Sequence, residues 1–241
     1  MNYILFLDFD GTLAPIVSKP TLAKLTKSHK NLLKQLAKQK NVTLALISGR
    51  QLSDLKKRVG LPGVYYAGNH GFEIIGPKIK KIHPKALKAK PILNKILQQL
   101  KTGLKSFPGV IIEDKSLTLS IHYRLARKKD IAKISKIFSI IVKPYLKLKK
   151  IRVTKGKKVF EIRPNIDWHK GKAVSWLLKQ LTSSRVTLPI YIGDDTTDED
   201  AFIALNKHGF TIRVSKDKNS QAKYFLKDVA DVYRFLGLFI N

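Results

Sequence analysis

The stretch 4–13 constrains the fold more than any other part of the chain. Four apolar residues lead directly into Asp8, Asp10 and Gly11, where the chain is free to turn. A short uninterrupted apolar run indicates a strand that is buried on both faces, as in parallel sheets. In open α/β sheets, ligands bind just beyond the carboxyl ends of the strands. The two carboxylates therefore stand where such a sheet would carry out its chemistry.

Asp8 and Asp10 are two residues apart, so on an extended chain their side chains share a face. Carboxylates crowded in this way repel each other, and a hard cation with oxygen ligands, most often Mg²⁺, relieves the repulsion. A solvated turn is the alternative, because Asp-x-Asp-Gly strings are common in turns. The spacing alone leaves both interpretations open.

A strand–helix rhythm begins here, stops in the middle of the chain and resumes near its end. Strands are predicted at 4–7, 42–47, 64–67, 189–192 and 210–214, and helices at 21–40, 52–59, 170–181 and 228–239, with Phe202 and Leu205 on a further helix. The run 72–75 ends at the turn signal Gly76-Pro77, where the rhythm changes. This alternation is typical of a doubly wound parallel sheet. The sequence therefore predicts an α/β fold.

The middle of the chain has a different pattern. Helices are predicted at 85–106 and 129–142, and strands at 110–113, 117–124, 147–153 and 157–163. Hairpins mixed with helices are typical of an antiparallel α+β domain. The predicted core is therefore split into 1–78 and 166–241, and an α+β cap of 79–165 is inserted between its two parts.

Charge is the most unusual property of the composition. Lys and Arg number 47 against 17 Asp and Glu, which gives a formal net charge of +30. Such a field attracts polyanions and phosphorylated substrates. Because the lysines are dispersed along nearly every segment, we interpret the charge as surface composition and expect no specific nucleic-acid partner.

Cysteine is absent, which excludes disulfides, thiolate nucleophiles and thiolate metal sites. No apolar run approaches the ~20 residues of a membrane-spanning helix, so no membrane partner is expected. The first residues predict a strand without a basic segment before it, and a secretory signal is therefore not expected. These features are compatible with a monomer in the cytoplasm, which is our prediction.

Polar groups collect where the predicted strands of the core end. They are Asp8 and Asp10, Ser48, the Gly68–Gly71 loop and Asp194, Asp195 and Asp198, with Lys170 opening a helix. A cation, several carboxylates, a hydroxyl and an ammonium together make a site for phosphoryl transfer. A carboxylate can attack phosphorus and form an acyl phosphate, while the hydroxyl and the ammonium bind the oxygens of the transferred group.

These motifs and their order resemble the haloacid dehalogenase superfamily of phosphatases. The resemblance implies a Rossmann-like core, and a cap between the serine and lysine motifs resembles the α/β-capped subclass. Within it, the chain resembles the trehalose-6-phosphate phosphatases. The matching motifs are DFDGTL at 8–13, SGR at 48–50, GNHGFEI at 68–74, EDKSLTLSIHYR at 113–124, FEIRP at 160–164, HKGKA at 169–173 and GDDTTDEDAF at 193–202.

The resemblance implies a role for each matching residue of the core. Asp8 would be the nucleophile and a Mg²⁺ ligand. Asp10 would be the general acid and base, and its backbone carbonyl would also bind the metal. Asp194 would complete the protein ligands, while Ser48 and Lys170 would hold the phosphoryl oxygens.

Other residues of the core would support this site or bind the sugar. Thr12 would orient Asp10, and Asp195 and Asp198 would support the metal ligands. The loop containing Gly68, Asn69 and His70 would reach the substrate. For His70, a purely structural hydrogen bond is the alternative.

In the cap, the resemblance singles out four residues as sugar or phosphate contacts: Glu113, Lys115, Arg124 and Glu161. Strand alternation places Thr118, Ser120, His122 and Arg124 on one face of 117–124. A solvated sheet face is the alternative for such residues. A site built to bond hydroxyls rejects analogues that lack them, which suits a disaccharide.

The leading hypothesis is a Mg²⁺-dependent phosphatase that converts trehalose 6-phosphate to trehalose and phosphate. A related sugar phosphatase, acting on sucrose 6-phosphate or a glycosyl-3-phosphoglycerate, is the nearest alternative because the core motifs are shared. A nucleic-acid-binding protein on a phosphatase scaffold is the alternative from another class. The complete set of catalytic motifs argues against it.

Overall fold

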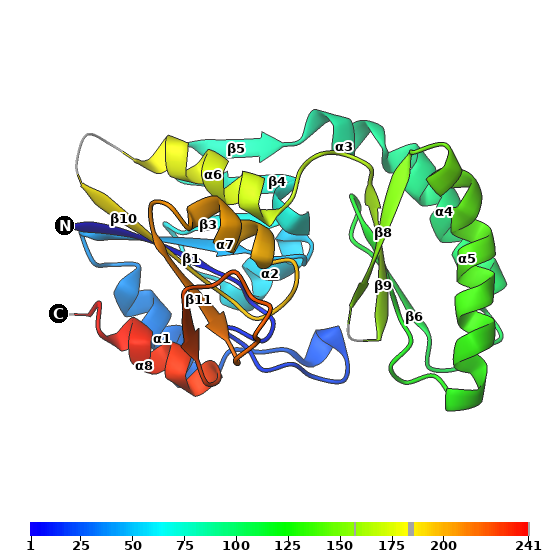
Figure 1. Cartoon of the computed structure of the whole chain (residues 1–241), viewed down its shortest axis with the longest axis horizontal. Coiled ribbons are helices and arrows are strands. Elements are labelled where there is room, and N and C mark those ends of the chain that lie inside the picture. The colour runs from blue at the N-terminus through cyan, green and yellow to red at the C-terminus, as the bar shows by residue number, and fades with distance from the viewer. Residues whose placement is uncertain (157, 183–185, 241) are drawn as a thin grey trace. The chain divides into compact units, whose positions relative to one another are not determined.

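The computed structural model describes residues 1–156, 158–182 and 186–240 (Figure 1). The chain forms two compact units, which we call the core unit (Met1–Lys81 with Trp168–Asn241) and the cap unit (Ile82–Asp167). The sequence predicts boundaries after residues 78 and 165. In the structure the units change after Lys81 and after Asp167, slightly later in the chain. In the described parts of the chain, every helix is too short or too polar to cross a membrane.

The core unit is built on an eight-stranded sheet with the order β12-β11-β10-β1-β2-β3-β4-β5. The strands are β1 (Asn2–Leu7), β2 (Val42–Ile47), β3 (Tyr65–Gly68), β4 (Glu73–Gly76), β5 (Ile79–Ile82), β10 (Thr187–Gly193), β11 (Phe210–Val214) and β12 (Tyr224–Leu226). Pairing is parallel from β12 through β10, β1 and β2 to β3, and β4 then runs antiparallel to β3. The predicted α/β class is confirmed.

Helices cover both faces of this sheet (Figure 1). The helices α1 (Lys27–Leu36), α2 (Leu52–Val59) and α8 (Val229–Gly237) pack on one face, and α6 (Lys170–Leu181) and α7 (Glu199–Leu205) pack on the other. Leu5 and Leu7 of β1 enter the first apolar layer, whereas Ile4 and Phe6 enter the second. Both faces of β1 are thus buried, which explains its unbroken apolar run.

Three elements of the core unit differ from the prediction. The helix predicted at 21–40 begins only at Lys27, because the Thr26 hydroxyl caps it by accepting from the His29 N–H group, and Pro20–Leu22 form a separate 3₁₀ turn. The short strands β5 and β12 have no predicted counterpart. Runs of three or four residues carry too little periodicity to be recognised as strands.

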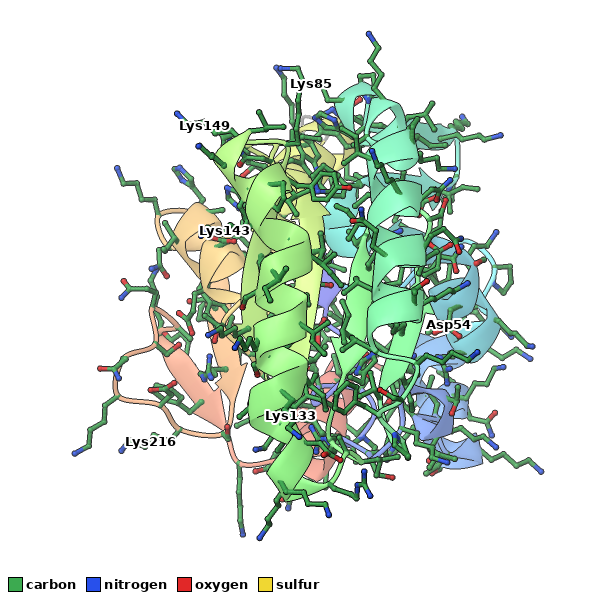
Figure 2. All side chains as sticks on the ribbon, turned by 90° about the vertical axis from the view of Figure 1, so that its right-hand side faces the viewer. Asp54, Lys85, Lys133, Lys143, Lys149 and Lys216 are labelled. Atoms are coloured by element: carbon green, nitrogen blue, oxygen red, sulfur yellow. The ribbon has the colours of Figure 1, made fainter. Side chains whose placement is uncertain are left out.

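The cap unit contains a four-stranded antiparallel sheet with the order β6-β7-β9-β8. Its elements are β6 (Ile111–Asp114), β7 (Leu119–His122), β8 (Ile151–Gly156), β9 (Val159–Pro164), α3 (Pro84–Lys88), α4 (Lys90–Gly103) and α5 (Ile131–Lys147). Figure 2 shows α4 and α5 side by side, with Lys133 and Lys143 pointing away from the cap sheet. The predicted α+β class of this part is confirmed.

Helix boundaries in the cap unit also differ from the prediction. The helix predicted at 85–106 is divided at Ala89, directly before Lys90 and Pro91 open α4. The helix α5 continues past the predicted end at 142 and includes Pro144, so the strand predicted from 147 starts only at Ile151. Lys157, the first residue of the strand predicted at 157–163, lies outside the described residues.

Candidate active site

The carboxyl ends of three neighbouring strands bring the predicted catalytic residues together. The strand β1 ends directly before Asp8, β2 ends directly before Ser48, and β10 ends directly before Asp194. The strands are parallel neighbours, and the Asp8 N–H group still donates to the Ile192 carbonyl at 2.9 Å. The sheet therefore places these side chains at one edge, as the sequence predicts.

Gly11 allows the chain to leave β1 close to Asp194. It has a φ of +85°, and a Cβ atom at this position would lie 2.2 Å from Oδ2 of Asp194. Any larger residue would both strain the backbone and collide with the carboxylate. The turn is closed by a 2.7 Å hydrogen bond from the Gly11 N–H group to the Ala14 carbonyl.

Lys170, the first residue of α6, places a buried ammonium beside the end of β1. Its Nζ atom lies 2.7 Å from Oδ1 of Asp8 and 2.8 Å from Oδ1 of Asp198. Burial lowers the pKa of Lys170, but the charges of Asp198 and Asp8 hold it well above its ordinary value. The ammonium therefore stays charged and can bind an oxyanion that arrives at Asp8.

Three buried carboxylates are clustered here, and two of them, Asp8 and Asp198, contact the ammonium. Oxygen atoms of Asp8, Asp194 and Asp198 lie within 4.8 Å of one another. Burial raises the pKa of Asp8 well above its usual range, the charges of Asp198 and Asp194 raise it further, and Lys170 opposes them. When all three acidic groups are ionised, they outweigh the one cation and the site carries negative charge. A hard divalent cation such as Mg²⁺ suits these oxygen donors and would balance the charge.

Asp198 has both of its oxygens bound by groups of the protein. Oδ1 accepts from Lys170 and, at 2.5 Å, from the Tyr191 hydroxyl. Oδ2 accepts from the N–H groups of Asp194 and Asp195, each at 3.0 Å. An ionised carboxylate has about four acceptor positions, and four donors already occupy them. This arrangement favours a supporting role for Asp198 over direct metal binding.

Asp10 is bound by the buried guanidinium of Arg50. Nε and Nη2 of Arg50 each lie 2.6 Å from one oxygen of Asp10, so the pair is bidentate. The Arg50 side chain is 6% exposed and also donates to Asp54 at 2.8 Å, which fixes the guanidinium from its other side. The sequence alone gives Arg50 no role, although it lies two residues after Ser48. The contact sets the position of Asp10.

The other predicted core residues lie around this edge of the sheet. Ser48 is buried, and its Oγ accepts from the Arg50 N–H group at 3.2 Å, so its own hydroxyl hydrogen can bind a phosphoryl oxygen. Thr12 is fully buried, but its hydroxyl has no hydrogen-bond partner among the described residues. A hydrogen bond that would orient Asp10 is thus not present there. Asp195 is exposed and accepts from the N–H and hydroxyl groups of Thr197.

The loop 68–71 follows β3 and is held beside the end of β2. Asn69 and His70 both have positive φ, at 50° and 57°. The His70 N–H group donates to the Ser48 carbonyl at 2.9 Å. A Cβ atom on Gly49 would lie 2.7 Å from the His70 ring, so only glycine leaves room for it. The imidazole is therefore packed against Gly49, the residue after Ser48.

In the cap unit, two of the predicted sugar contacts, Glu113 and Glu161, lie on the sheet face opposite α4 and α5. Leu119, Ile121, Phe160 and Ile162 pack into the apolar layer with the helices, so the residues alternating with them point to the other face. The strand register places four of these in one row: Glu113, Ser120, Glu161 and Thr154. The predicted polar face is thus assembled across all four strands.

Glu161, near the centre of this row, is held between two cations. Lys115 Nζ lies 3.3 Å from its Oε1, and Arg163 Nη2 lies 2.9 Å from its Oε2. The side chains of Lys115 and Arg163 are both nearly buried. Such a carboxylate is fixed in place by two charged donors, which suits recognition of sugar hydroxyls. Arg124 lies beyond the end of β7 and is exposed.

Solved structures identify the fold. The C-terminal domain of C. albicans trehalose-6-phosphate phosphatase matches with a TM-score of 0.85 at 25% identity, over 99% of this chain and 92% of that chain. A haloacid dehalogenase-like hydrolase from Bacteroides thetaiotaomicron matches with a TM-score of 0.63 at 16% identity, over 98% of this chain and all of the other. At this identity the match is evidence for the fold alone. The chain has the haloacid dehalogenase fold, as its motifs predict.

Sequence comparison narrows this class to one family. Residues 6–230 match the family described as trehalose-phosphatase. A trehalose-phosphate phosphatase of Mycobacterium ulcerans is 40% identical over 239 residues, which cover 96% of this chain and 60% of the relative. A probable trehalose-phosphate phosphatase D of Arabidopsis thaliana is 39% identical over 247 residues, which cover 97% of this chain and 66% of the relative. The chain belongs to the trehalose-phosphatase family, and it spans 60% to 66% of the length of these relatives.

Proposed function

We propose that this chain is a Mg²⁺-dependent phosphatase that hydrolyses trehalose 6-phosphate through an aspartyl phosphate on Asp8. The observation that carries the proposal is the buried contact between Asp8 and Lys170 at the end of β1, next to Asp194. A carboxylate nucleophile, an ammonium and a further metal-binding carboxylate are what phosphoryl transfer to an aspartate requires. Family membership adds support from the sequence.

In this mechanism a carboxylate oxygen of Asp8 attacks phosphorus, and the bond from phosphorus to the sugar oxygen breaks. Lys170 and Ser48 bind the oxygens of the phosphoryl group. Asp10 gives its proton to the departing sugar oxygen and then takes a proton from the water that hydrolyses the aspartyl phosphate. Because both oxygens of Asp10 are bound by Arg50 in this structure, proton transfer needs one of these contacts to be exchanged.

Mg²⁺ would be held by Asp8 and Asp194 with the backbone carbonyl of Asp10. When bound, it would neutralise charge on the phosphoryl oxygens and on Asp8. The supporting observation is the cluster of three buried carboxylates, of which two contact the single ammonium of Lys170.

Trehalose 6-phosphate is the substrate that the relatives' names favour, since both are named as trehalose-phosphate phosphatases. Sucrose 6-phosphate and glycosyl-3-phosphoglycerates remain the alternatives, because the core residues act on the phosphate alone. We place selectivity for the sugar in the cap unit, on the residues Glu113, Lys115, Arg124 and Glu161. For the loop of Gly68, Asn69 and His70 in the core unit, contact with the substrate stays a prediction.

A panel of phosphate-release assays tests the proposed function. Trehalose 6-phosphate, sucrose 6-phosphate, a glucosyl-3-phosphoglycerate and p-nitrophenyl phosphate are compared with Mg²⁺ and with a chelator. We expect the highest kcat/KM for trehalose 6-phosphate and loss of activity in the chelator. A higher kcat/KM for either other sugar ester would assign the chain to that substrate, and equal rates in the chelator would exclude the metal.

Glu161→Ala is expected to separate sugar recognition from chemistry. The carboxylate is held by Lys115 and Arg163 and bonds no phosphate in the proposed mechanism. Losing a charged hydrogen bond to a substrate hydroxyl costs about 1.5–3 kcal/mol, or roughly 10- to 150-fold in kcat/KM. This loss should appear with trehalose 6-phosphate and not with p-nitrophenyl phosphate.

Asp114→Ala is the matched control, because Asp114 is an exposed carboxylate at the end of β6 in the same sheet. It should leave both activities unchanged. If Glu161→Ala reduces the two activities equally, Glu161 supports the fold or the core site instead of the sugar.

Mg²⁺ should stabilise the folded chain through Asp194. A metal that binds only the folded state at 100 times its Kd adds about 2.7 kcal/mol to the free energy of unfolding. Asp194→Asn removes a proposed ligand charge and should abolish most of this gain in urea titrations. Asp217→Asn, at an exposed carboxylate of the core unit, should keep it. Equal gains in both variants would place the ion elsewhere.

The positive charge is, in this proposal, a property of the surface. We expect any binding to DNA to be non-specific and steeply lost with salt, because it depends on counterion release. Sequence-dependent binding at physiological salt, measured by mobility shift, would instead favour the nucleic-acid alternative. A monomer in the cytoplasm without a membrane partner stays a prediction from the composition.

A further inference from the structure

Tyr191 brings a hydroxyl into the active site from within the apolar core. It lies in β10, two residues before Gly193, and its side chain is fully buried in the layer beneath α6 and α7. Its ring packs edge-on against Phe202, with the ring centres 5.7 Å apart. A phenylalanine would satisfy this packing equally well. The reason for a tyrosine therefore lies at the end of the ring, where the hydroxyl donates to Asp198.

The Tyr191 hydroxyl and the Lys170 ammonium both donate to the same oxygen of Asp198. The Tyr191 hydroxyl lies 2.5 Å and Lys170 Nζ lies 2.8 Å from Oδ1. Lys170 in turn lies 2.7 Å from Asp8, so two buried carboxylates compete for one ammonium. A buried carboxylate that loses a donor becomes a stronger competitor, because its unmet charge is costly. Without the hydroxyl, Asp198 would draw the ammonium away from Asp8.

The other oxygen of Asp198 ties the same carboxylate to the loop that carries Asp194. Oδ2 accepts from two consecutive N–H groups of that loop, at Asp194 and Asp195. A Cβ atom on Gly193 would lie 2.3 Å from Cγ of Asp198, which shows how closely the carboxylate is packed against the end of β10. The orientation of Asp198 thus affects both Lys170 and the loop.

We infer that Tyr191 is a positioning residue for phosphoryl transfer: its hydroxyl satisfies Asp198 so that the Lys170 ammonium stays on Asp8. The inference rests on the proposed function, because it concerns the step in which Asp8 attacks phosphorus. It gives Tyr191 no contact with the substrate and no proton to transfer. The residue acts through Asp198 and Lys170 alone.

Tyr191→Phe tests this inference with a single-atom change. Residues that support an active site from outside its reacting groups typically contribute about 10- to 100-fold, and we expect a loss in this range in kcat with little change in KM. Because Lys170 binds the phosphoryl group, the loss should be the same for trehalose 6-phosphate and p-nitrophenyl phosphate. Rapid-quench measurement should place it in the formation of the aspartyl phosphate.

Tyr66→Phe is the matched control. Tyr66 is a buried tyrosine of β3 in the same sheet, and its hydroxyl donates at 2.8 Å to the backbone carbonyl of Leu61. Both variants lose one buried hydroxyl, so urea titrations should show losses of stability of similar size. Only Tyr191→Phe should lose kcat, which separates positioning from general destabilisation.

Three results would overturn the inference. They are an unchanged kcat in Tyr191→Phe, an equal loss of kcat in Tyr66→Phe, and a loss confined to KM. Assays with p-nitrophenyl phosphate distinguish failure of the inference about Tyr191 from failure of the proposed function. If the wild-type chain hydrolyses the aryl phosphate but not trehalose 6-phosphate, the proposed substrate is wrong, while the two variants still decide the role of Tyr191. A chain that hydrolyses neither would contradict both.

Discussion

Asp8→Asn reduces phosphate release from trehalose 6-phosphate to the uncatalysed background. The neutral amide cannot attack phosphorus as the carboxylate does, and it also removes one of the charges proposed to hold Mg²⁺. Lys170 keeps its contact with Asp198 in this variant, so the ammonium remains paired. Steady-state phosphate release with saturating Mg²⁺ measures the effect, and circular dichroism checks that the variant is folded.

Asp217→Asn is the control for this change, because Asp217 is an exposed carboxylate of the core unit whose side chain contacts Asn219 and Arg213 and not Asp8 or Lys170. It should retain wild-type activity. If Asp8→Asn kept more than a few per cent of the wild-type kcat, Asp8 would not be the nucleophile.

Asp10→Asn lowers the turnover of trehalose 6-phosphate by about 10²- to 10⁴-fold, the usual contribution of general acid–base catalysis. Asp8 and the Asp10 backbone carbonyl are unchanged, so attack on phosphorus remains chemically possible. The sugar oxygen is a poor leaving group and needs a proton. An activated aryl oxygen leaves without one, and formation of the aspartyl phosphate from p-nitrophenyl phosphate should therefore suffer less.

Single-turnover rates with the two substrates measure this difference. Hydrolysis of the aspartyl phosphate should be slow with both, because the base for water is missing. Equal losses in the first step for both substrates would show that Asp10 does not protonate the leaving group. Arg50→Lys provides a comparison that keeps the Asp10 carboxylate but removes the bidentate contact that sets its position.

The sequence predicts the centre of the core unit well because its signals there are local. A short unbroken apolar run such as 4–7 favours a strand buried on both faces, and polar residues directly after such a strand lie at the carboxyl edge of the sheet. Asp8, Ser48 and Asp194 are found at that edge for this reason. The edge strands β5 and β12 carry no comparable signal, since each is very short.

Arg50 and Tyr191 could not be assigned a role from the sequence because their partners are distant or hidden. Arg50 binds Asp10 across 40 positions of the chain. Tyr191 has the neighbours of an ordinary core residue, and only the fold shows that its hydroxyl reaches Asp198. In each case the side chain is largely buried and acts through the polar group at its end. Such contacts depend on packing, which periodicity does not describe.

The polar row of the cap unit could be predicted from the sequence only in part. Alternation along one strand predicts that Ser120 and His122 share a face. In the structure, Leu119 and Ile121 pack into the apolar layer, so Ser120 and His122 lie on the opposite face of the strand. Which residues of different strands stand side by side depends on register, which alternation leaves open. The neighbourhood of Glu113, Ser120 and Glu161 therefore becomes visible only in the folded sheet.

Trapping the covalent intermediate tests the proposed mechanism most directly. The wild-type chain is mixed with trehalose 6-phosphate and Mg²⁺, quenched with acid within one turnover, digested and examined by mass spectrometry. The proposed mechanism predicts one added phosphoryl group, located on Asp8, that disappears as turnover is completed. A phosphoryl group on any other residue, or rapid phosphate release with no covalent intermediate at any quench time, would contradict it.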